Sequence, residues 1–155
     1  MKPFEKLVPD VTEFAVCDQK VYLSPVLDLY NSEVVAFSIS RSPNFYQTLE
    51  MLTDLLAKMP SGSKPLLHSD QGWQYQMKDF RSLLQAHNIT QSMSRKGNCL
   101  DNSVMENFFG RLKTETFIGE KFKSVEDFEE KLKEYIGYFN NDRISLKLVH
   151  DTLSL

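Results

Sequence analysis

A short apolar stretch of this chain ends in an acid: residues 66–72 read LLHSDQG, and Asp70 closely follows the two leucines. A carboxylate at the end of a buried strand is unfavourable unless a hydrogen bond, a cation or a metal ion compensates its charge. Two further acids, Asp10 and Glu106, stand at the ends of predicted elements. These three acids are the candidate site residues.

Each acid also has a purely structural interpretation. Asp10 begins a predicted strand, and Asp70 fits a turn of the kind in which Asp is common. Glu106 is the third residue after Ser103, which is the spacing of a Ser-x-x-Glu capping box at a helix start. Pattern alone favours capping over catalysis for Glu106.

The apolar pattern predicts five strands and four helices joined by turns. The strands are expected at residues 11–17, 20–30, 33–40, 65–69 and 89–93, and the helices at residues 44–59, 76–87, 103–117 and 124–140. Three consecutive strands make an antiparallel meander, and the later alternation of strands and helices gives a mixed sheet with helices on its faces. On the helix at 103–117, Glu106 and Lys113 lie opposite the apolar face.

Composition bounds the class of protein. The chain has 155 residues, 41% of them hydrophobic, and a net charge of −3. This length predicts one domain, residues 1–155, and no apolar run is long enough for a transmembrane helix. Cys17 and Cys99 form neither a disulfide framework nor a zinc signature, and no signal peptide precedes the domain, so a cytoplasmic protein is expected. Residues 95–123 hold six cations and four acids, which indicates either a weak basic patch or a solvated helix face.

Several longer motifs occur in order along the chain: PDVTEF, LLHSDQGWQY, GNCLDNSVMENFFGRLKTE and YIGYFNNDRISLKL. Together they resemble the integrase-type (DDE) catalytic core of bacterial insertion-sequence transposases, which is similar to retroviral integrase catalytic domains. The resemblance spans residues 7–148. It implies an α/β protein of the ribonuclease-H-like fold, with a five-stranded mixed sheet flanked by helices. It also implies an acidic triad of Asp10, Asp70 and Glu106, with 35 residues between the last two.

The chemistry that this resemblance implies is metal-dependent DNA strand cleavage and joining. Carboxylate oxygens are hard ligands that suit Mg²⁺ or Mn²⁺, and two such ions assist an in-line phosphoryl displacement. Expected partners are double-stranded DNA, as element ends and target, and further copies of the chain. Candidate DNA contacts are Arg95, Lys96, Asn102, Arg111, Lys113 and Arg143. Trp73 and Tyr75 are candidates either for base stacking or for the core, and His68 for support of the strand end.

Some features depart from the pattern of the family. Val8 and Pro9 precede Asp10 where the family usually has Trp-Thr, and proline lacks the N–H that a central strand uses. The helical DNA-binding segments that the family carries upstream are absent from the sequence, and so is its Pro-containing ending. Two alternatives therefore stay open: a ribonuclease-H-like nuclease acting on RNA–DNA hybrids, and a non-catalytic truncated transposase remnant.

Overall fold

The computed structural model describes residues 1–94 and 103–153, with all of their side chains except those of residues 142–153. The strands are β1 (Lys6–Pro9), β2 (Thr12–Val16), β3 (Gln19–Asp28), β4 (Glu33–Ser40), β5 (Leu66–Ser69) and β6 (Thr90–Met93). The helices are α1 (Phe45–Lys58), the 3₁₀ turn η1 (Trp73–Gln76), α2 (Lys78–Ala86), α3 (Ser103–Thr116) and α4 (Val125–Leu153). No helix of the described residues is long and apolar enough to cross a membrane.

The strands form one mixed sheet. β3 runs antiparallel to β4 on one side and to both β1 and β2 on the other, while β5 is parallel to β1 and β6 is parallel to β5. β1 pairs with the end of β3 and β2 with its beginning, so these two short strands follow one another along the same edge of β3. The six segments therefore occupy five strand positions, which agrees with the predicted five-stranded mixed sheet.

The start of the sheet differs from the sequence prediction. A strand was expected at residues 11–17, with Asp10 at its start, but the chain is already extended and paired at Lys6–Pro9. The pairing with β3 breaks around Asp10 and Val11 and resumes as β2. The strand expected at residues 11–17 is confirmed as β2, whereas β1 was not predicted, because it has only four residues and its last is proline, which argues against a central strand. Asp10 thus follows a strand instead of beginning one.

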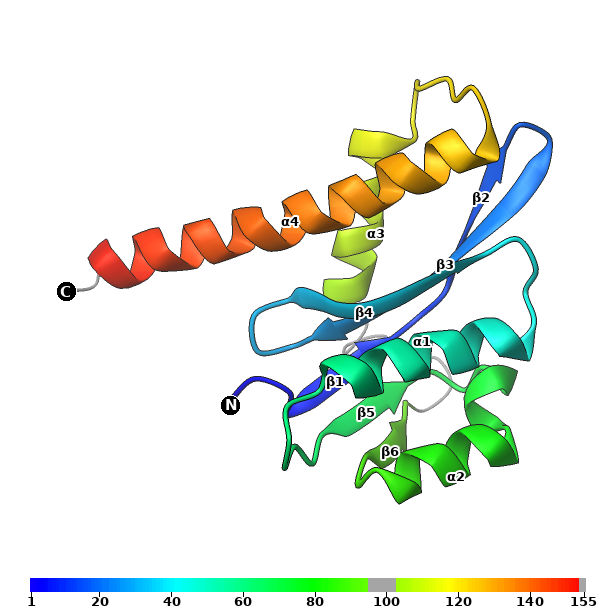
Figure 1. Ribbon diagram of the computed structural model, residues 1–155. Coiled ribbons are helices and arrows are strands. Elements are labelled where there is room, and N and C mark those ends of the chain that lie inside the picture. Colours follow the sequence, from blue (N-terminus) through cyan, green and yellow to red (C-terminus); the bar gives the residue numbers. More distant parts are fainter. Residues whose placement is uncertain (95–102, 154–155) are drawn as a thin grey trace.

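Each face of the sheet carries its own hydrophobic core. Neighbouring residues of one strand point to opposite faces, so Leu7 and Val26 belong to one core while Val8 and Leu27 belong to the other. The first core is completed by residues of α1 and α2, and the second by residues of α3 and α4. Figure 1 shows this arrangement, with α1 and α2 on one side of the sheet and α3 and α4 on the other.

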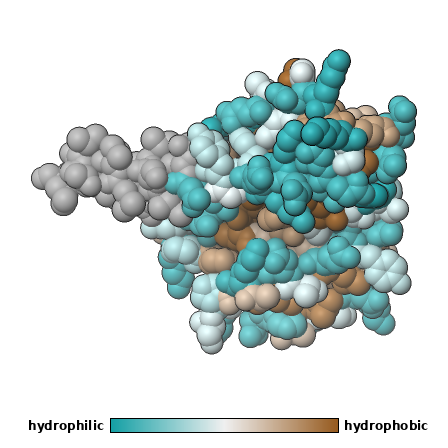
Figure 2. Space-filling view, turned by 45° about the horizontal axis from the view of Figure 1, so that its top comes forward, coloured by the Kyte–Doolittle hydropathy of each residue, from teal (hydrophilic) through white to brown (hydrophobic). Residues whose placement is uncertain are grey.

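The helices follow the predicted periodicity with two differences. The helix expected at residues 76–87 appears as α2, Lys78–Ala86, and is preceded by the unpredicted turn η1, while the helix expected at 124–140 continues to Leu153. The chain beyond residue 140 contains neither Gly nor Pro, so no residue type there stops the helix. Figure 1 shows the end of α4 extending beyond the sheet. Figure 2 shows the molecule with the α4 side turned forward. Hydrophilic side chains cover most of the face in view, and apolar ones lie in a recess between α4 and α1.

Candidate functional site

Asp10 and Asp70 come together because the strands that precede them are parallel neighbours. The β1–β5 register pairs Lys6 with Leu66 and Leu7 with Leu67. Continued three residues farther, the same register sets Asp10 beside Asp70 at the carboxyl ends of the two strands. This is the edge of an open α/β sheet at which ligand sites collect.

Pro9 helps to open the sheet at this point. The N–H of Asp10 donates to the carbonyl of Pro25 on β3, at 3.2 Å. Because successive N–H groups of a strand point to opposite sides, the missing N–H of Pro9 falls on the β5 side. The β1–β5 ladder ends at the pair Leu7–Leu67, just before the proline. The proline is therefore compatible with a central strand here, because the β1–β5 hydrogen bonding has already ended and needs no N–H from residue 9.

Each of the two carboxylates is oriented by one hydrogen bond from the backbone. Asp10 Oδ1 accepts from the N–H of Val11 at 2.8 Å, and Asp70 Oδ1 accepts from the N–H of Gly72 at 2.8 Å. Within the described residues, the Oδ2 atom of neither carboxylate accepts a hydrogen bond. The turn-capping interpretation of Asp70 is thus confirmed, and capping leaves its second oxygen available.

Gly72 lies against the side chains of Asp70 and Gln74, with little space for a Cβ atom. A Cβ atom at residue 72 would stand 3.0 Å from Asp70 Oδ1 and 2.9 Å from the Oε1 atom of Gln74. Any larger residue would displace these two side chains. The backbone N–H of residue 72 holds the Asp70 carboxylate, and the glycine leaves space for that carboxylate in its turn.

The electrostatics of Asp10 show the cost of this arrangement. Burial raises the pKa of Asp10 to about 6 from an ordinary value of 3.8, the Val11 hydrogen bond opposes this, and the charges of Asp70 and Glu106 raise it further. No described Lys or Arg side chain contributes to lowering it. The site consequently gathers negative charge that the described part of the chain does not neutralise, which is the situation that a bound cation relieves.

Tyr75 forms part of the same region, although sequence reasoning considered it only for base stacking or the core. Its side chain is buried, and burial together with the charges of Asp10 and Asp70 raises its pKa strongly, so the hydroxyl stays protonated. That hydroxyl has no hydrogen bond of good geometry to the described residues, although the Gln74 side chain acts to lower its pKa. Tyr75 is too buried to stack on a base, whereas Trp73 is 55% exposed.

Glu106 lies in the first turn of α3, with its side chain exposed to solvent. Its charge contributes to the raised pKa of Asp10, so it belongs to the surroundings of the two aspartates. Ser103 is the first residue of α3, and the capping-box interpretation of Ser103 and Glu106 stays a prediction. Among residues 1–94 and 103–141, no three His, Cys, Asp or Glu side chains form a group that could hold a metal ion. The structure therefore brings two acids together with the third nearby.

The predicted DNA contacts fall into two groups. Arg95, Lys96 and Asn102 lie outside the described residues, and so does the side chain of Arg143. The Arg111 guanidinium lies 5.4 Å from the Phe139 ring centre on α4, and the Lys113 ammonium lies 5.6 Å from the Phe14 ring centre on β2. Both cations thus contact the α3–α4 side of the molecule, and their role toward DNA stays a prediction.

His68 has the supporting place that the sequence suggests. The side chain is buried on β5, and its Nδ1 atom lies 2.8 Å from the Ser92 hydroxyl on β6. This contact joins the two strands just before Asp70. His68 therefore stabilises the strand end that carries the acid.

The chain is similar in sequence to integrase core domains and to bacterial transposases. The chain matches an integrase core domain family over residues 1–99 and a second integrase core domain family over residues 106–154. It is 52% identical over 147 residues to an uncharacterized transposase-like protein of Haemophilus influenzae, covering 95% of this chain and 68% of that protein. It is 51% identical over 147 residues to the putative transposase InsK for insertion sequence element IS150 of Escherichia coli, covering 95% of this chain and 52% of that protein.

The fold is also similar to a retroviral protein. The HTLV-2 integrase catalytic core domain, solved in complex with magnesium in a dimeric form, matches with a TM-score of 0.60 and 17% identity. The match covers 74% of this chain and 70% of that chain. This similarity confirms the predicted ribonuclease-H-like fold. The chain spans about half to two thirds of the length of the two bacterial relatives.

Proposed function

Because the chain belongs to the integrase core domain family, we propose that it is a metal-dependent polynucleotidyl transferase core that cleaves and joins DNA strands during transposition. The observation that carries this proposal is the β1–β5 register, which sets Asp10 beside Asp70 at one edge of the sheet. The two hydrophobic cores share one sheet, which supports a single catalytic domain over residues 1–155.

The donor atoms at this edge fit a divalent cation. Asp10 and Asp70 each present an oxygen without a hydrogen bond among the described residues, and carboxylate oxygens are the ligands that Mg²⁺ and Mn²⁺ prefer. Binding of a cation would also offset the burial and the charge repulsion that raise the pKa of Asp10. We assign Asp10, Asp70 and Glu106 as the residues that would hold two ions, with a movement of α3 needed to bring Glu106 to the two aspartates.

When bound by these carboxylates, two such ions would supply positive charge to the reacting phosphate. The chain's own part is to hold and orient the ligands. The N–H groups of Val11 and Gly72 fix one oxygen of each aspartate, and the protonated Tyr75 hydroxyl offers a hydrogen-bond donor beside them. In cleavage a water replaces the 3′ oxygen on phosphorus, and in joining a DNA 3′-hydroxyl does so.

The partners follow from the proposed reaction. Double-stranded DNA would supply both the element ends and the target. The related HTLV-2 integrase core was solved in a dimeric form, which supports the proposal that this chain also associates with copies of itself.

The test compares nicking of duplex DNA in Mn²⁺ by the wild type, by Asp70→Asn and by Asp18→Asn. Asp18 lies in the β2–β3 turn with a φ of 60°, a conformation that Asn adopts readily, so it is a matched control away from the site. Nicking by the wild type and Asp18→Asn, with loss in Asp70→Asn, is expected, and calorimetry should show weaker Mn²⁺ binding only in Asp70→Asn.

Other outcomes decide against this function. Equal Mn²⁺ binding by the wild type and Asp70→Asn would show that Asp70 is not a ligand of the ion. Cleavage confined to RNA–DNA hybrids would favour the ribonuclease alternative, and metal binding without any turnover would favour the non-catalytic remnant.

A further inference from the structure

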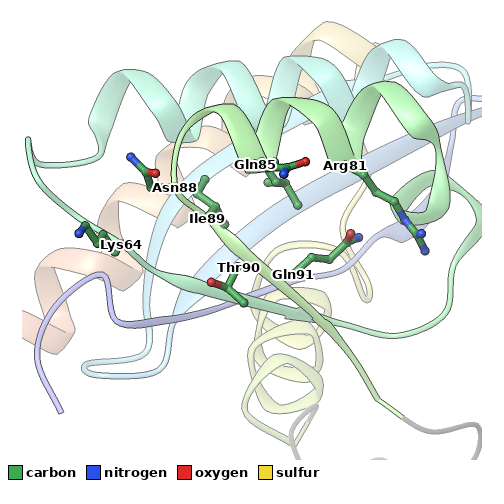
Figure 3. Close-up of a pocket in the computed structure, with 8 residues that line it drawn as sticks. Lys64, Arg81, Gln85, Asn88, Ile89, Thr90 and Gln91 are labelled. Carbon is green, nitrogen blue, oxygen red and sulfur yellow. The ribbon is translucent and has the colours of Figure 1, made fainter.

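A hollow of about 530 Å³ lies between α2 and the edge strand β6, apart from the acids (Figure 3). Two cations, four amide or hydroxyl side chains and two apolar residues line it. They are Lys64, Arg81, Leu84, Gln85, Asn88, Ile89, Thr90 and Gln91, here called the β6 hollow. No acidic residue is among them, although the chain carries more acids than cations.

The two cations of the β6 hollow lack the partners that other cations of the chain have. Lys20, Arg41, Lys58, Arg111 and Lys131 each form an ion pair with an acid. Within the described residues, Lys64 and Arg81 form none, and both side chains are exposed. Other hollows of the surface include acids such as Glu5, Glu50 or Glu134 in their lining. The β6 hollow is therefore complementary to a negatively charged ligand.

The placement of the two cations favours an extended ligand. Figure 3 shows Lys64 and Arg81 at opposite ends of the hollow, with Thr90 and Gln91 of β6 between them. A single small anion would meet one cation or the other. A phosphodiester backbone repeats its charge along its length and can meet both, while the amide and hydroxyl groups between the cations hydrogen bond to sugar or phosphate oxygens.

The distance from the β6 hollow to the acids suits the same DNA molecule. Leu66 on β5 is paired with Thr90, and Asp70 follows Leu66 by four residues, which is about 13 Å along a strand. Lys64 lies six residues before Asp70, or about 20 Å if the chain is extended. At 3.4 Å per nucleotide step, these lengths correspond to roughly four to six steps of duplex DNA.

The β6 hollow is also tied to the acids through its lining. The Gln91 side chain donates a hydrogen bond to the backbone carbonyl of Tyr75, at 2.5 Å. Tyr75 in turn lies close enough to Asp10 and Asp70 for their charges to affect it. The two regions are therefore connected through Tyr75.

We propose that the β6 hollow binds the phosphodiester backbone of the DNA whose scissile phosphate lies at the acids, with Lys64 contacting a phosphate about six nucleotides away and Arg81 contacting a phosphate at the other end of the hollow. The site rests on the proposed function for the identity of its ligand. It adds a sequence-independent contact that positions the duplex and does no chemistry.

The test measures binding of a labelled duplex by fluorescence anisotropy in EDTA, from 50 to 200 mM salt. The double variant Lys64→Ala/Arg81→Ala is compared with Lys123→Ala/Lys133→Ala, which removes the same charge from exposed residues outside the β6 hollow. The slope of log affinity against log salt should become shallower by about 1.8 in the first variant, because each lost phosphate contact contributes about 0.9. The wild type should thus lose about tenfold more affinity over this range than that variant.

Three results would overturn the site: an unchanged slope, an equal change in the control pair, or an effect that persists on duplexes extending fewer than about four base pairs beyond the scissile phosphate on either side. Inorganic phosphate at constant ionic strength provides a further arm. Thermal protection of the wild type alone by phosphate, with an unchanged DNA slope, would identify a small-anion site and overturn the DNA proposal.

The nicking assay separates this inference from the proposed function. Asp70→Asn should keep the wild-type salt slope although it loses nicking. Normal nicking together with an unchanged salt slope in Lys64→Ala/Arg81→Ala would reject the DNA contact at the β6 hollow and leave the catalytic proposal in place. The expected change in slope without nicking by the wild type would support the DNA contact and reject the catalytic proposal.

Discussion

The polar groups at the β4 edge of the sheet differ from those at the carboxyl ends of β1 and β5 in whether they are hydrogen bonded to a partner. At the β4 edge, the Asn140 side chain accepts from the N–H of Val34 and donates to its carbonyl, both at 2.9 Å, and Asp54 accepts from the N–H of Phe37. At the strand ends, two acids stand together and burial raises the pKa of Asp10. At the β4 edge, which has only a structural role, the polar groups are hydrogen bonded to each other. At the proposed catalytic site, the carboxylates are buried and repel one another.

This difference implies that changes at the two places affect stability with opposite signs. Removing a polar side chain at the β4 edge exposes unpaired backbone groups and should destabilise the protein. Removing a charge at the strand ends relieves burial and repulsion and should stabilise it. Such a trade between stability and activity is common at functional sites.

The largest expected effect on stability is that of Asp10→Asn in EDTA. The folded-state pKa of about 6 lies above the ordinary 3.8, so the wild type loses stability as the pH rises from about 4 through 6. Asn carries no charge and avoids this loss. The variant should be more stable by up to about 3 kcal/mol above pH 7 and equal to the wild type below pH 4, as measured by urea unfolding. A difference that is the same at every pH would contradict this account of Asp10.

Asn140→Ala should act in the opposite direction at the β4 edge. The N–H and carbonyl of Val34 lose their partner, and we expect a loss of about 1 to 3 kcal/mol in the free energy of unfolding. Asn141→Ala is the matched control, because its side chain is exposed on the same helix and should change little. Equal losses in the two variants would show that the Val34 contact contributes nothing specific.

Addition of Mg²⁺ should stabilise the strand ends and leave the β4 edge unaffected. A Mg²⁺ concentration about ten times the dissociation constant adds about 1.4 kcal/mol to the stability of a protein that binds it only when folded. The shift in melting temperature should appear in the wild type and in Asn140→Ala, disappear in Asp10→Asn, and be reversed by EDTA. A full shift in Asp10→Asn would mean that the ion binds elsewhere.

The smallest effect is expected from two helical glycines, one near each region. Gly110 lies one turn after Glu106 on α3, and Gly137 lies one turn before Asn140 on α4. A Cβ atom at either position would meet nothing within 4 Å. Each Gly→Ala change should therefore add about 0.5 to 1 kcal/mol through helix propensity, as measured by thermal unfolding. A loss of stability in only one would reveal a contact that the open space at that glycine does not predict.

Much of the fold could be predicted from local pattern, because long amphipathic segments determine their own secondary structure. The strand at residues 33–40 and the helix that begins at Ser103 appear as predicted. β1 was missed because a four-residue strand ending in Pro9 carries little periodicity. The end of α4 was missed because the polar residues at 140–143 interrupt the apolar pattern while the helix continues.

The candidate site was predicted in part. The three acids and their motifs can be read from the chain, but Tyr75 cannot be assigned to them, because its burial beside Asp10 and Asp70 depends on how η1 folds back after β5. The cations of the β6 hollow were missed for a similar reason. Lys64 and Arg81 are separated in sequence and belong to no basic run, so only the packing of α2 beside β6 makes them neighbours of one hollow.

The sequence by itself determined the types of the acids, their spacing and the resemblance that links them to DNA strand transfer, since these depend only on which residue follows which. The tertiary structure decided that Asp10 follows a strand, that this strand runs parallel to β5, and that the two acids therefore share one edge. The reason is physical: strand pairing between distant segments depends on the packing of two cores onto one sheet, which no local window of residues contains.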